Sequence, residues 1–320
     1  MKKILLTLTL IIFSTFFVGA QNVSNQVKQP KNEKTLAERL GYSRESKLLI
    51  VNIDDLGMTH GINAAAIKTF KNSPVRSGSV MVPCPWFNEI AEYARKNTDA
   101  DLGLHLTLNS EWTNFRWGPV VSKNLVPSLL DADGYLHLET DVAPKINVKE
   151  AETEIRAQIE RARVFGLQPT HLDSHMLMLV QTKELFEMYL RVAREYKLPI
   201  RVARDWSARA PFMADLLTPN DIVIDKIAEA TPAVTPEKWN DFYAELLKKL
   251  EPGVTEISVH IGYDDEEFRA ATFNHPNWGA AWRQRDFEFF NSETFRRLLA
   301  ENRIKIITWR EINQLTVRTN

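Results

Sequence analysis

The chain has 320 residues, of which 44% are hydrophobic and 25% are charged, with 12 glycines and 15 prolines. These proportions are typical of a globular protein and exclude a collagen-like or largely disordered one. The 40 basic and 41 acidic residues nearly cancel, whereas proteins that bind the phosphate backbone usually carry a basic excess. We therefore expect no nucleic-acid partner. The sequence does not indicate an oligomeric state.

The first 20 residues have the layout of a secretory signal peptide. Two lysines precede an apolar run over residues 4–18, and Gly19-Ala20 supplies the small residues of a cleavage site. A membrane anchor is the alternative, but the run is shorter than the ~20 residues of a spanning helix. No cysteine follows it that could carry a lipid. We expect cleavage after residue 20 and an exported protein, periplasmic or secreted, with no membrane span.

After a polar linker at residues 21–46, with a short helix near its end, short apolar runs alternate with helical patterns. The expected strands are Lys47–Ile53, Ser77–Val82, Asp101–Leu108, Thr170–His175, Pro199–Ala203, Glu256–Gly262 and Lys305–Trp309. The expected helices are Gly61–Phe70, Asn88–Lys96, Lys149–Phe165, Lys183–Tyr196, Pro236–Leu250 and Ser292–Glu301.

Strands that alternate with helices indicate βα units and a parallel sheet. A doubly wound fold usually has a glycine-rich turn after its first strand, and IDDLGMTHG is no such turn. We therefore expect one α/β domain over residues 47–320, a TIM-barrel-like (β/α) barrel with eight strands or fewer. Two long insertions, Asn109–Asn147 and Tyr263–Phe290, follow strand carboxyl ends, where barrel enzymes build their sites.

Titratable residues gather at these strand ends. They are Asp54, Asp55, His105, His171, Asp173, His175 and His260. Strand periodicity places His171, Asp173 and His175 on one face. A single histidine is usually structural and paired aspartates often cap a helix, but an aspartate with two histidines is a usual ligand set for a catalytic divalent metal. Their joint occurrence therefore favours a metal-dependent hydrolase.

Three segments in order, LLIVNIDDLGMTHGIN (48–63), GLHLTL (103–108) and PTHLDSH (169–175), resemble the YdjC-like carbohydrate deacetylases, the ChbG/HpnK group. VHIG (259–262) and the region RQRDFEFFNS…ITWREI match more loosely, so the resemblance spans residues 47–312. It implies a TIM-barrel-like fold and the metal-dependent removal of acetyl groups from N-acetylated amino sugars.

By position in these motifs, the resemblance implies that Asp55, His105 and His175 bind one divalent metal ion, either Mg²⁺ or Zn²⁺. It implies Asp54 as the general base that takes a proton from water, and His260 as the acid that protonates the departing amine. Asp54 lies next to Asp55 in the chain, so the two carboxylates are badly placed to flank a glycosidic bond.

The same resemblance gives His171 and Asp173 the role of orienting metal ligands or water. Arg283 with Asp286 is similar to an arginine–acid pair near the family's site, and we expect this pair to hold Asp54. A competing pair at the same spacing is Arg285 with Glu288.

The chain departs from the family after His175, where members often have further histidines and this sequence has Met176 and Met178. The substrate contacts of those histidines cannot be carried over, and we expect the methionines to pack in the core. The one cysteine, Cys84, is expected to be a small buried hydrophobe without a disulfide partner.

Four tryptophans lie in the two insertions. They are Trp112 and Trp117 in the first and Trp278 and Trp282 in the second. We expect them to contact the apolar faces of sugar rings, the alternative being that they anchor the loops. The expected function is the removal of N-acetyl groups from amino sugars or short N-acetylglucosamine oligosaccharides. The alternatives are a non-catalytic exported carbohydrate-binding protein and another metal-dependent glycan hydrolase.

Overall fold

The computed structural model describes residues 34–208 and 210–318, in which seven strands form one parallel sheet. The strand order is β4-β3-β2-β1-β6-β5, and β7 also pairs with β1. The strands are β1 Lys47–Leu56, β2 Ser77–Val80, β3 Asp101–Leu106, β4 Leu172–Ser174, β5 Lys226–Ala228, β6 Gly253–Val259 and β7 Ile304–Ile306. The expected signal peptide lies outside the described residues.

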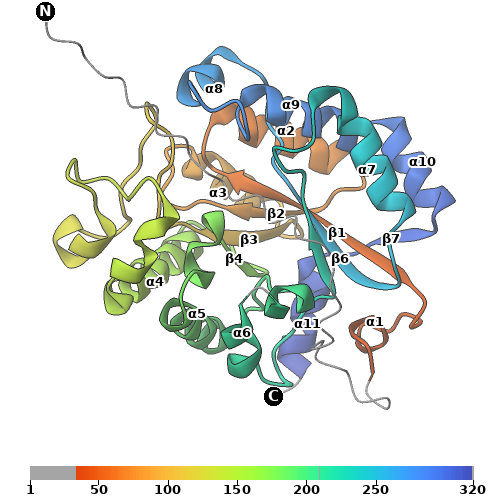
Figure 1. Cartoon of the computed structure of the whole chain (residues 1–320), viewed down its shortest axis with the longest axis horizontal. Helices are drawn as coiled ribbons and strands as arrows, with labels where there is room; N and C mark the ends of the chain where they lie inside the picture. Colours follow the sequence, from red (N-terminus) through yellow and green to blue (C-terminus); the bar gives the residue numbers. More distant parts are fainter. Residues whose placement is uncertain (1–33, 209, 319–320) are drawn as a thin grey trace, which may run out of the picture.

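The sheet curls into a half-barrel surrounded by helices (Figure 1), which confirms the expected α/β barrel-like fold. The helices are α1 Leu36–Arg39, α2 His60–Asn72, α3 Phe87–Lys96, α4 Val148–Val164, α5 Lys183–Tyr196, α6 Pro211–Leu216, α7 Trp239–Lys248, α8 Glu266–Ala271, α9 Ala280–Phe290, α10 Glu293–Glu301 and α11 Trp309–Arg318. None of the helices in the described ranges is both long enough and apolar enough to cross a membrane.

The central strand β1 is long because its sequence, KLLIVNIDDL, is buried along nearly its whole length. Such a continuous apolar run is typical of a parallel strand that is covered on both faces. It pairs with β6 from Lys47↔Gly253 to Ile53↔Val259, and with β2 from Asn52 onward. The carboxyl end of β1, which carries the two aspartates, therefore lies between β6 and β2.

Helix α5 fixes the strand that leads to His175. Thr182 caps its first turn by accepting a hydrogen bond from Leu185 N, and apolar side chains at helical spacing are buried against the sheet. One of them, Tyr189, donates its hydroxyl to the carbonyl of Leu172 in β4 at 2.8 Å. The helix thus holds the short strand β4 in place by packing and by one buried hydrogen bond.

Two expected strands differ in the structure. The segment at residues 199–203 forms isolated bridges only, Leu172↔Ile200 and Ala203↔Ile224, which continue the sheet from β4 toward β5. Strand β5 was not expected, because its side chains are half-buried or exposed and leave no apolar run in the sequence. The last expected strand ends early at Ile306 because the carboxylate of Asp101 caps helix α11, accepting the backbone N–H of Trp309 at 2.8 Å.

The first insertion, residues 109–147, is tied to helix α4 and to the end of β3. Glu154 of α4 is buried and accepts the backbone N–H groups of Val120 and Val121 at 2.8 and 3.1 Å. Gln158, one turn later, accepts the backbone N–H of Thr107 at 3.0 Å. In Figure 1 this yellow segment lies on the side toward which the arrows of β1 and β2 point. It is therefore placed at the carboxyl ends of the strands.

Candidate active site

The two aspartates at the end of β1 are both buried, although successive residues of a regular strand point to opposite faces. Asp55 has a φ of 66°, in the left-handed region, and the pairing of β1 with β2 shifts register between Ile53 and Leu56. Aspartate tolerates this conformation better than most residues. The local irregularity is what allows Asp54 and Asp55 to take part in one buried site.

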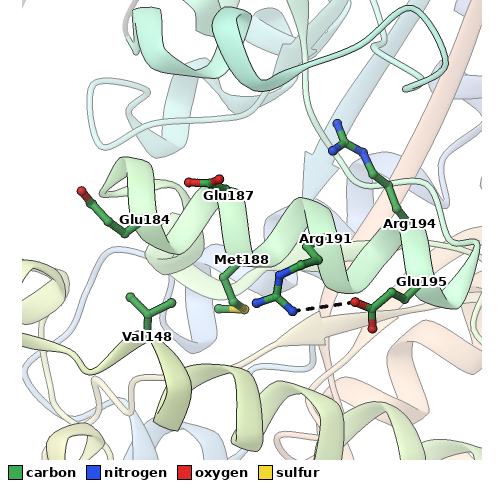
Figure 2. Close-up of a pocket in the computed structure, with 7 residues that line it drawn as sticks. All are labelled: Val148, Glu184, Glu187, Met188, Arg191, Arg194 and Glu195. Atoms are coloured by element: carbon green, nitrogen blue, oxygen red, sulfur yellow. Dashed lines mark ion pairs between the residues drawn. The ribbon is translucent and has the colours of Figure 1, made fainter.

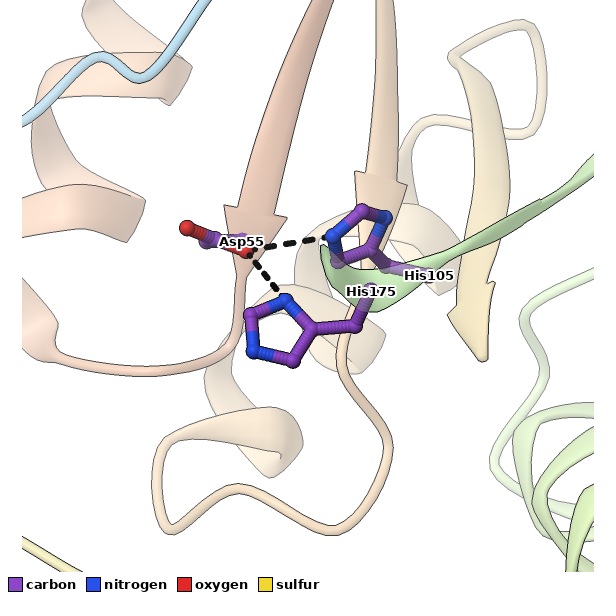
Figure 3. Close-up of side chains that lie close together, drawn as sticks. All are labelled: Asp55, His105 and His175. Atoms are coloured by element: carbon purple, nitrogen blue, oxygen red, sulfur yellow. Dashed lines mark ion pairs between the residues drawn. The ribbon is translucent and has the colours of Figure 1, made fainter. Parts of the chain in front are cut away.

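Asp55 faces two histidines that come from other parts of the chain (Figure 3). Its Oδ1 atom is 3.3 Å from Nε2 of His105, on β3, and 3.3 Å from Nδ1 of His175, just after β4. All three side chains are buried, and their ligand atoms lie within 4.8 Å of one another. The structure thus brings together the three residues that the sequence motifs predict as metal ligands.

One structural observation indicates that this group of three residues fits a divalent metal ion. The Oδ1 atom of Asp55 is buried and has no hydrogen-bond partner among the described residues. A buried carboxylate oxygen without a partner is costly, and here it faces two imidazole nitrogens. One carboxylate oxygen and two imidazoles are a common protein ligand set for a catalytic metal, so Asp55, His105 and His175 would hold it.

Carboxylates contact the far nitrogens of both histidines. Asp173 Oδ1 lies 2.5 Å from Nδ1 of His105, and Glu111 Oε2 lies 2.9 Å from Nε2 of His175. Burial opposes the charged imidazoles, but Asp173 raises the pKa of His105 to about 10, and Glu111 with Asp55 raises the pKa of His175 to about 9. A metal ion that binds at this group must therefore displace protons from the histidines.

Asp54 is held by donors on both of its oxygens. Arg201 Nη1 lies 3.0 Å from Oδ1 and 2.8 Å from Oδ2, Asn52 Nδ2 donates to Oδ1 at 2.7 Å, and Ser258 Oγ donates to Oδ2 at 2.7 Å. Burial by itself would raise the pKa of Asp54, but the Arg201 guanidinium holds that pKa below its usual range. The carboxylate is therefore ionised at neutral pH.

Arg283 contacts Asp55 and not Asp54, so the expectation that it holds Asp54 is wrong. Its Nη2 atom lies 2.6 Å from Asp55 Oδ2, because helix α9 directs it into the site from the second insertion. Asp286, one turn later, accepts hydrogen bonds from the side chains of Trp239 and Tyr243 and from the backbone N–H of His260. Asp286 thus positions the histidine at the end of β6.

The competing pair at the same spacing lies elsewhere. Arg285 places its guanidinium over the ring of Trp239, 4.8 Å from the centroid, and Glu288 accepts a hydrogen bond from Gln284. Neither side chain is among the described partners of the two aspartates.

His260 approaches the site from β6, with Nε2 3.9 Å from Asp55 Oδ2. Its side chain keeps 15% of its surface exposed, more than the buried histidines beside it. Burial lowers the pKa of His260 to about 4, so its imidazole is neutral at pH 7. The residue can donate a proton only after it has gained one.

His171 is not placed to orient a metal ligand, which corrects that expectation. Its ring stacks on Trp309 with centroids 4.9 Å apart, its Nδ1 lies 3.1 Å from Thr170 Oγ1, and none of the three ligand residues is among its described contacts. An extended chain rises ~3.3 Å per residue, so His171 is up to ~13 Å along the chain from His175. Periodicity alone does not give this separation from the metal ligands.

Three of the four predicted sugar-binding tryptophans are buried, which contradicts that expectation for them. Trp112 donates to Met58 Sδ at 3.0 Å, Trp117 donates to the carbonyl of Asn109 at 2.9 Å, and Trp282 packs edge-on against another tryptophan. These rings anchor the insertions. Trp278 stacks on Trp282 at 5.2 Å and is partly exposed, so it is the one of the four that keeps surface for a ligand to contact.

The methionines after His175 have different surroundings. Met178 is buried in the core, as expected, whereas Met176 is 38% exposed, which contradicts the expectation for that residue. Met176 and Leu177 both have left-handed φ angles, 47° and 57°. Cys84 is buried, and burial with two nearby carboxylates raises its pKa well above the ordinary value. It is an inert core thiol.

Two residues of the site were missed by sequence reasoning. Arg201 lay in a segment expected to be a buried strand, and a buried arginine requires an acidic partner, so a signal was present without naming the partner. Glu111 follows Asn109-Ser110 in the first insertion, where no local pattern marks it. Both depend on contacts between distant parts of the chain.

A separate surface groove does not belong to this site. It has a volume of about 680 Å³ and is lined mainly by α5, with Val148 of α4 opposite (Figure 2). Arg191 on its wall already pairs with Glu152 at 2.6 Å and with Glu195 at 3.7 Å. The groove contains none of the three predicted ligands, so we assign it no part in the chemistry.

The family of proteins described as YdjC-like matches residues 48–301, and the chain belongs to this family. A carbohydrate deacetylase from Thermus thermophilus is 31% identical over 87% of this chain and 98% of its own. A chitooligosaccharide deacetylase from Yersinia enterocolitica is 34% identical over 49% of this chain and 60% of its own. A solved structure from Enterococcus faecalis, whose name suggests cellobiose-phosphate cleavage, has a TM-score of 0.71 and 26% identity, covering 83% of this chain and 99% of its own.

Proposed function

We propose that this protein is a divalent-metal-dependent hydrolase that removes acetyl groups from N-acetylated amino sugars, including short N-acetylglucosamine oligosaccharides. The observation that carries the proposal is the buried Oδ1 of Asp55, which makes no hydrogen bond within the described residues and faces Nε2 of His105 and Nδ1 of His175 at 3.3 Å each. The relatives named carbohydrate and chitooligosaccharide deacetylases support this chemistry and this substrate class.

A divalent metal ion, when bound, supplies Lewis-acid polarisation of the acetamide carbonyl and lowers the pKa of water. The protein supplies the base: Asp54 is ionised, and it is adjacent in the chain to the ligand Asp55. The hydroxyls of Ser79 and Ser258, which donate to Asp54, can rotate and free a carboxylate lone pair. Asp54 then accepts the proton of the attacking water.

His260 is the group that returns a proton to the departing amine. It is neutral at pH 7 and partly exposed at the edge of the site, so it takes up a proton from solvent during the reaction, and Asp54 releases the proton that it took from water back to solvent. Asp286 holds its backbone N–H at 2.9 Å, which fixes the end of β6. Arg283 holds Asp55 Oδ2 and leaves Oδ1 directed toward the two histidines.

We propose Zn²⁺ as the metal, because two imidazole ligands suit Zn²⁺ better than Mg²⁺, which prefers oxygen. Elemental analysis of the purified protein measures this directly. The Zn²⁺ assignment predicts about one zinc per chain after reconstitution and acetate release that zinc restores better than magnesium. Recovery with magnesium alone contradicts it.

The central experiment incubates the protein with chitobiose, with and without a chelator, and measures acetate, free amine and mass. We expect one free amine for each acetate and a loss of ~42 mass units per event, as hydrolysis of an acetamide requires. His105→Ala should remove both metal and acetate release, whereas His137→Ala in the first insertion should retain both. Shortened but fully acetylated sugars would indicate a glycosidase, and unchanged sugar that binds would indicate a carbohydrate-binding protein.

We also propose that residues 1–20 direct export and are then removed, so the protein meets its glycans outside the cytoplasm. The charged start, the apolar run and the small residues before Gln21 support this. Amino-terminal sequencing of the protein from its native host should begin at Gln21. A chain that retains Met1 in the cytoplasm would refute it.

A further inference from the structure

We infer that Glu111 is a positioning residue for His175, and that the first insertion is thereby part of the metal centre. The inference rests on the proposed metal site, but not on any particular substrate. Glu111 Oε2 lies 2.9 Å from Nε2 of His175, while Nδ1 of the same ring lies 3.3 Å from Asp55 Oδ1. The carboxylate therefore contacts the nitrogen that points away from the ligand cluster.

The other histidine has the same arrangement with its nitrogens exchanged. His105 directs Nε2 toward Asp55 and Nδ1 toward Asp173, while His175 directs Nδ1 toward Asp55 and Nε2 toward Glu111. A carboxylate on the far nitrogen of a metal-binding histidine fixes both the ring orientation and which nitrogen carries the proton. Because the two rings use different nitrogens, each needs its own acceptor.

The position of Glu111 is fixed by its two neighbours in the chain. Ser110 is buried, and its hydroxyl accepts the backbone N–H of Trp117 at 3.0 Å. Trp112 is buried and donates to Met58 Sδ at 3.0 Å, only three residues after Asp55. Glu111 itself keeps 13% of its side chain exposed, so it is held by buried neighbours on both sides and directed at His175.

Without Glu111, the ring of His175 loses the hydrogen-bond acceptor that holds it in one orientation. A half-turn of the ring about its Cβ–Cγ bond would then put the carbon Cδ2 in place of Nδ1 opposite Asp55, at little cost, and the ligand nitrogen would be lost from the cluster. Losses of such outer partners weaken metal affinity by about 10–100-fold. Since Glu111 comes from the first insertion, a loop outside the strands determines how well the strand-borne ligands bind.

The test measures Zn²⁺ affinity by competition with a chromophoric chelator, in the absence of sugar. Glu111→Ala should weaken zinc affinity by about 10–100-fold. Glu111→Gln should lose less, because its amide oxygen still accepts a hydrogen bond from Nε2. Glu139→Gln, an exposed carboxylate of the same insertion, is the matched control and should match the wild type.

A spectroscopic readout distinguishes positioning from a general structural role. In the zinc-loaded protein with ¹⁵N-labelled histidine, long-range NMR spectra should show His175 bound through Nδ1 with a proton on Nε2. Glu111→Ala should show a weakened Nδ1–zinc signal or exchange broadening at this histidine alone. Wild-type zinc affinity in both Glu111 variants, or bonding through Nε2 in the wild type, would overturn the inference.

The outcomes separate this inference from the proposed function. If no acetylated sugar is a substrate but the Glu111 variants bind zinc weakly, the deacetylase proposal fails and the positioning role stands. If acetate release is confirmed and the variants differ from the wild type only in KM for sugar, Glu111 contacts substrate and the inference is wrong.

Discussion

Replacement of Arg201 by methionine should both destabilise the fold and raise the pKa of Asp54. The guanidinium is almost fully buried, and its Nη1 atom lies within 3.4 Å of oxygens of Asp54, Asp173 and Glu256. It is the cation among three buried carboxyl groups. Methionine has a similar length and no charge, so the substitution removes the charge while filling most of the space.

The size of the effect follows from the contact at 2.8 Å between Arg201 and Asp54. Coulomb's law with an effective dielectric constant of ~20 gives an attraction of ~6 kcal/mol at that distance. Breaking a buried pair on one side costs ~3–5 kcal/mol, because the remaining charge stays buried. A folded domain is stable by only ~5–15 kcal/mol, so Arg201→Met should lose about a fifth of the unfolding free energy or more.

The catalytic consequence has a definite sign. In the wild type the guanidinium lowers the pKa of Asp54, so the base stays ionised far into the acid range. Without Arg201 the pKa of Asp54 rises, and the acidic limb of the pH profile of kcat/KM should move to higher pH. In the wild type, the ionised Asp54 contributes stability above pH ~4, and this stability is lost as pH falls through the lowered pKa. Arg201→Met should lack this contribution.

The assay is urea unfolding at pH 7 together with the pH profile of acetate release. Arg204→Met is the matched control, because it removes an arginine three residues later whose contact with Asp225, at 3.0 Å, is about one-third exposed. Exposed pairs contribute ~0–1 kcal/mol. Equal unfolding free energies for the two variants, together with an unmoved acidic limb in Arg201→Met, would refute the reasoning.

Three further predictions concern single residues. Asp54→Asn should abolish acetate release while zinc stoichiometry stays at the wild-type value, and near-normal turnover would exclude Asp54 as the base. His171→Ala should leave zinc affinity unchanged but lower the unfolding free energy by a few kcal/mol, because the ring packs on Trp309 away from the ligands; lost zinc would contradict this. Glu256→Gln should flatten the pH dependence of Tm between about pH 5 and 8. Burial raises the pKa of Glu256 to about 8. Its protonated form therefore stabilises the fold at low pH, and that stability is lost as pH rises toward 8. A Tm curve for Glu256→Gln that runs parallel to the wild-type curve would contradict the assignment.

The sequence by itself was sufficient for the architecture and for the centre of the site. Apolar runs that alternate with helical patterns require parallel strands covered by helices, and the carboxyl ends of such strands meet at one edge. Asp55, His105 and His175 stand at the ends of three strands in motif positions, so their convergence follows from topology. The barrel-like parallel sheet is as predicted from these patterns. The choice of these three side chains among the titratable residues at the strand ends came from the motif resemblance, and the structure brings the three together.

Only the tertiary structure decided which partner each of these side chains contacts. Arg201 reaches Asp54 across 147 positions of sequence, and Arg283 reaches Asp55 across 228. These contacts depend on the curl of the sheet, on the irregular backbone at Asp55 and on the direction of helix α9. None of these leaves a pattern in neighbouring residues, so the arginine expected at Asp54 is found at Asp55.

In the two insertions as well, the sequence alone did not predict which side chains are buried and which contact the site. Composition and position made Trp112 and Trp117 candidates for sugar binding, yet both rings are buried and anchor the loop. Glu111, which no sequence pattern marked, contacts His175. An aromatic ring is equally suited to a core and to a sugar, and a glutamate in a polar loop is usually solvated. Which of these occurs is set by how the loop folds back over the strand ends, and that depends on distant anchors such as Glu154 and Gln158 in α4.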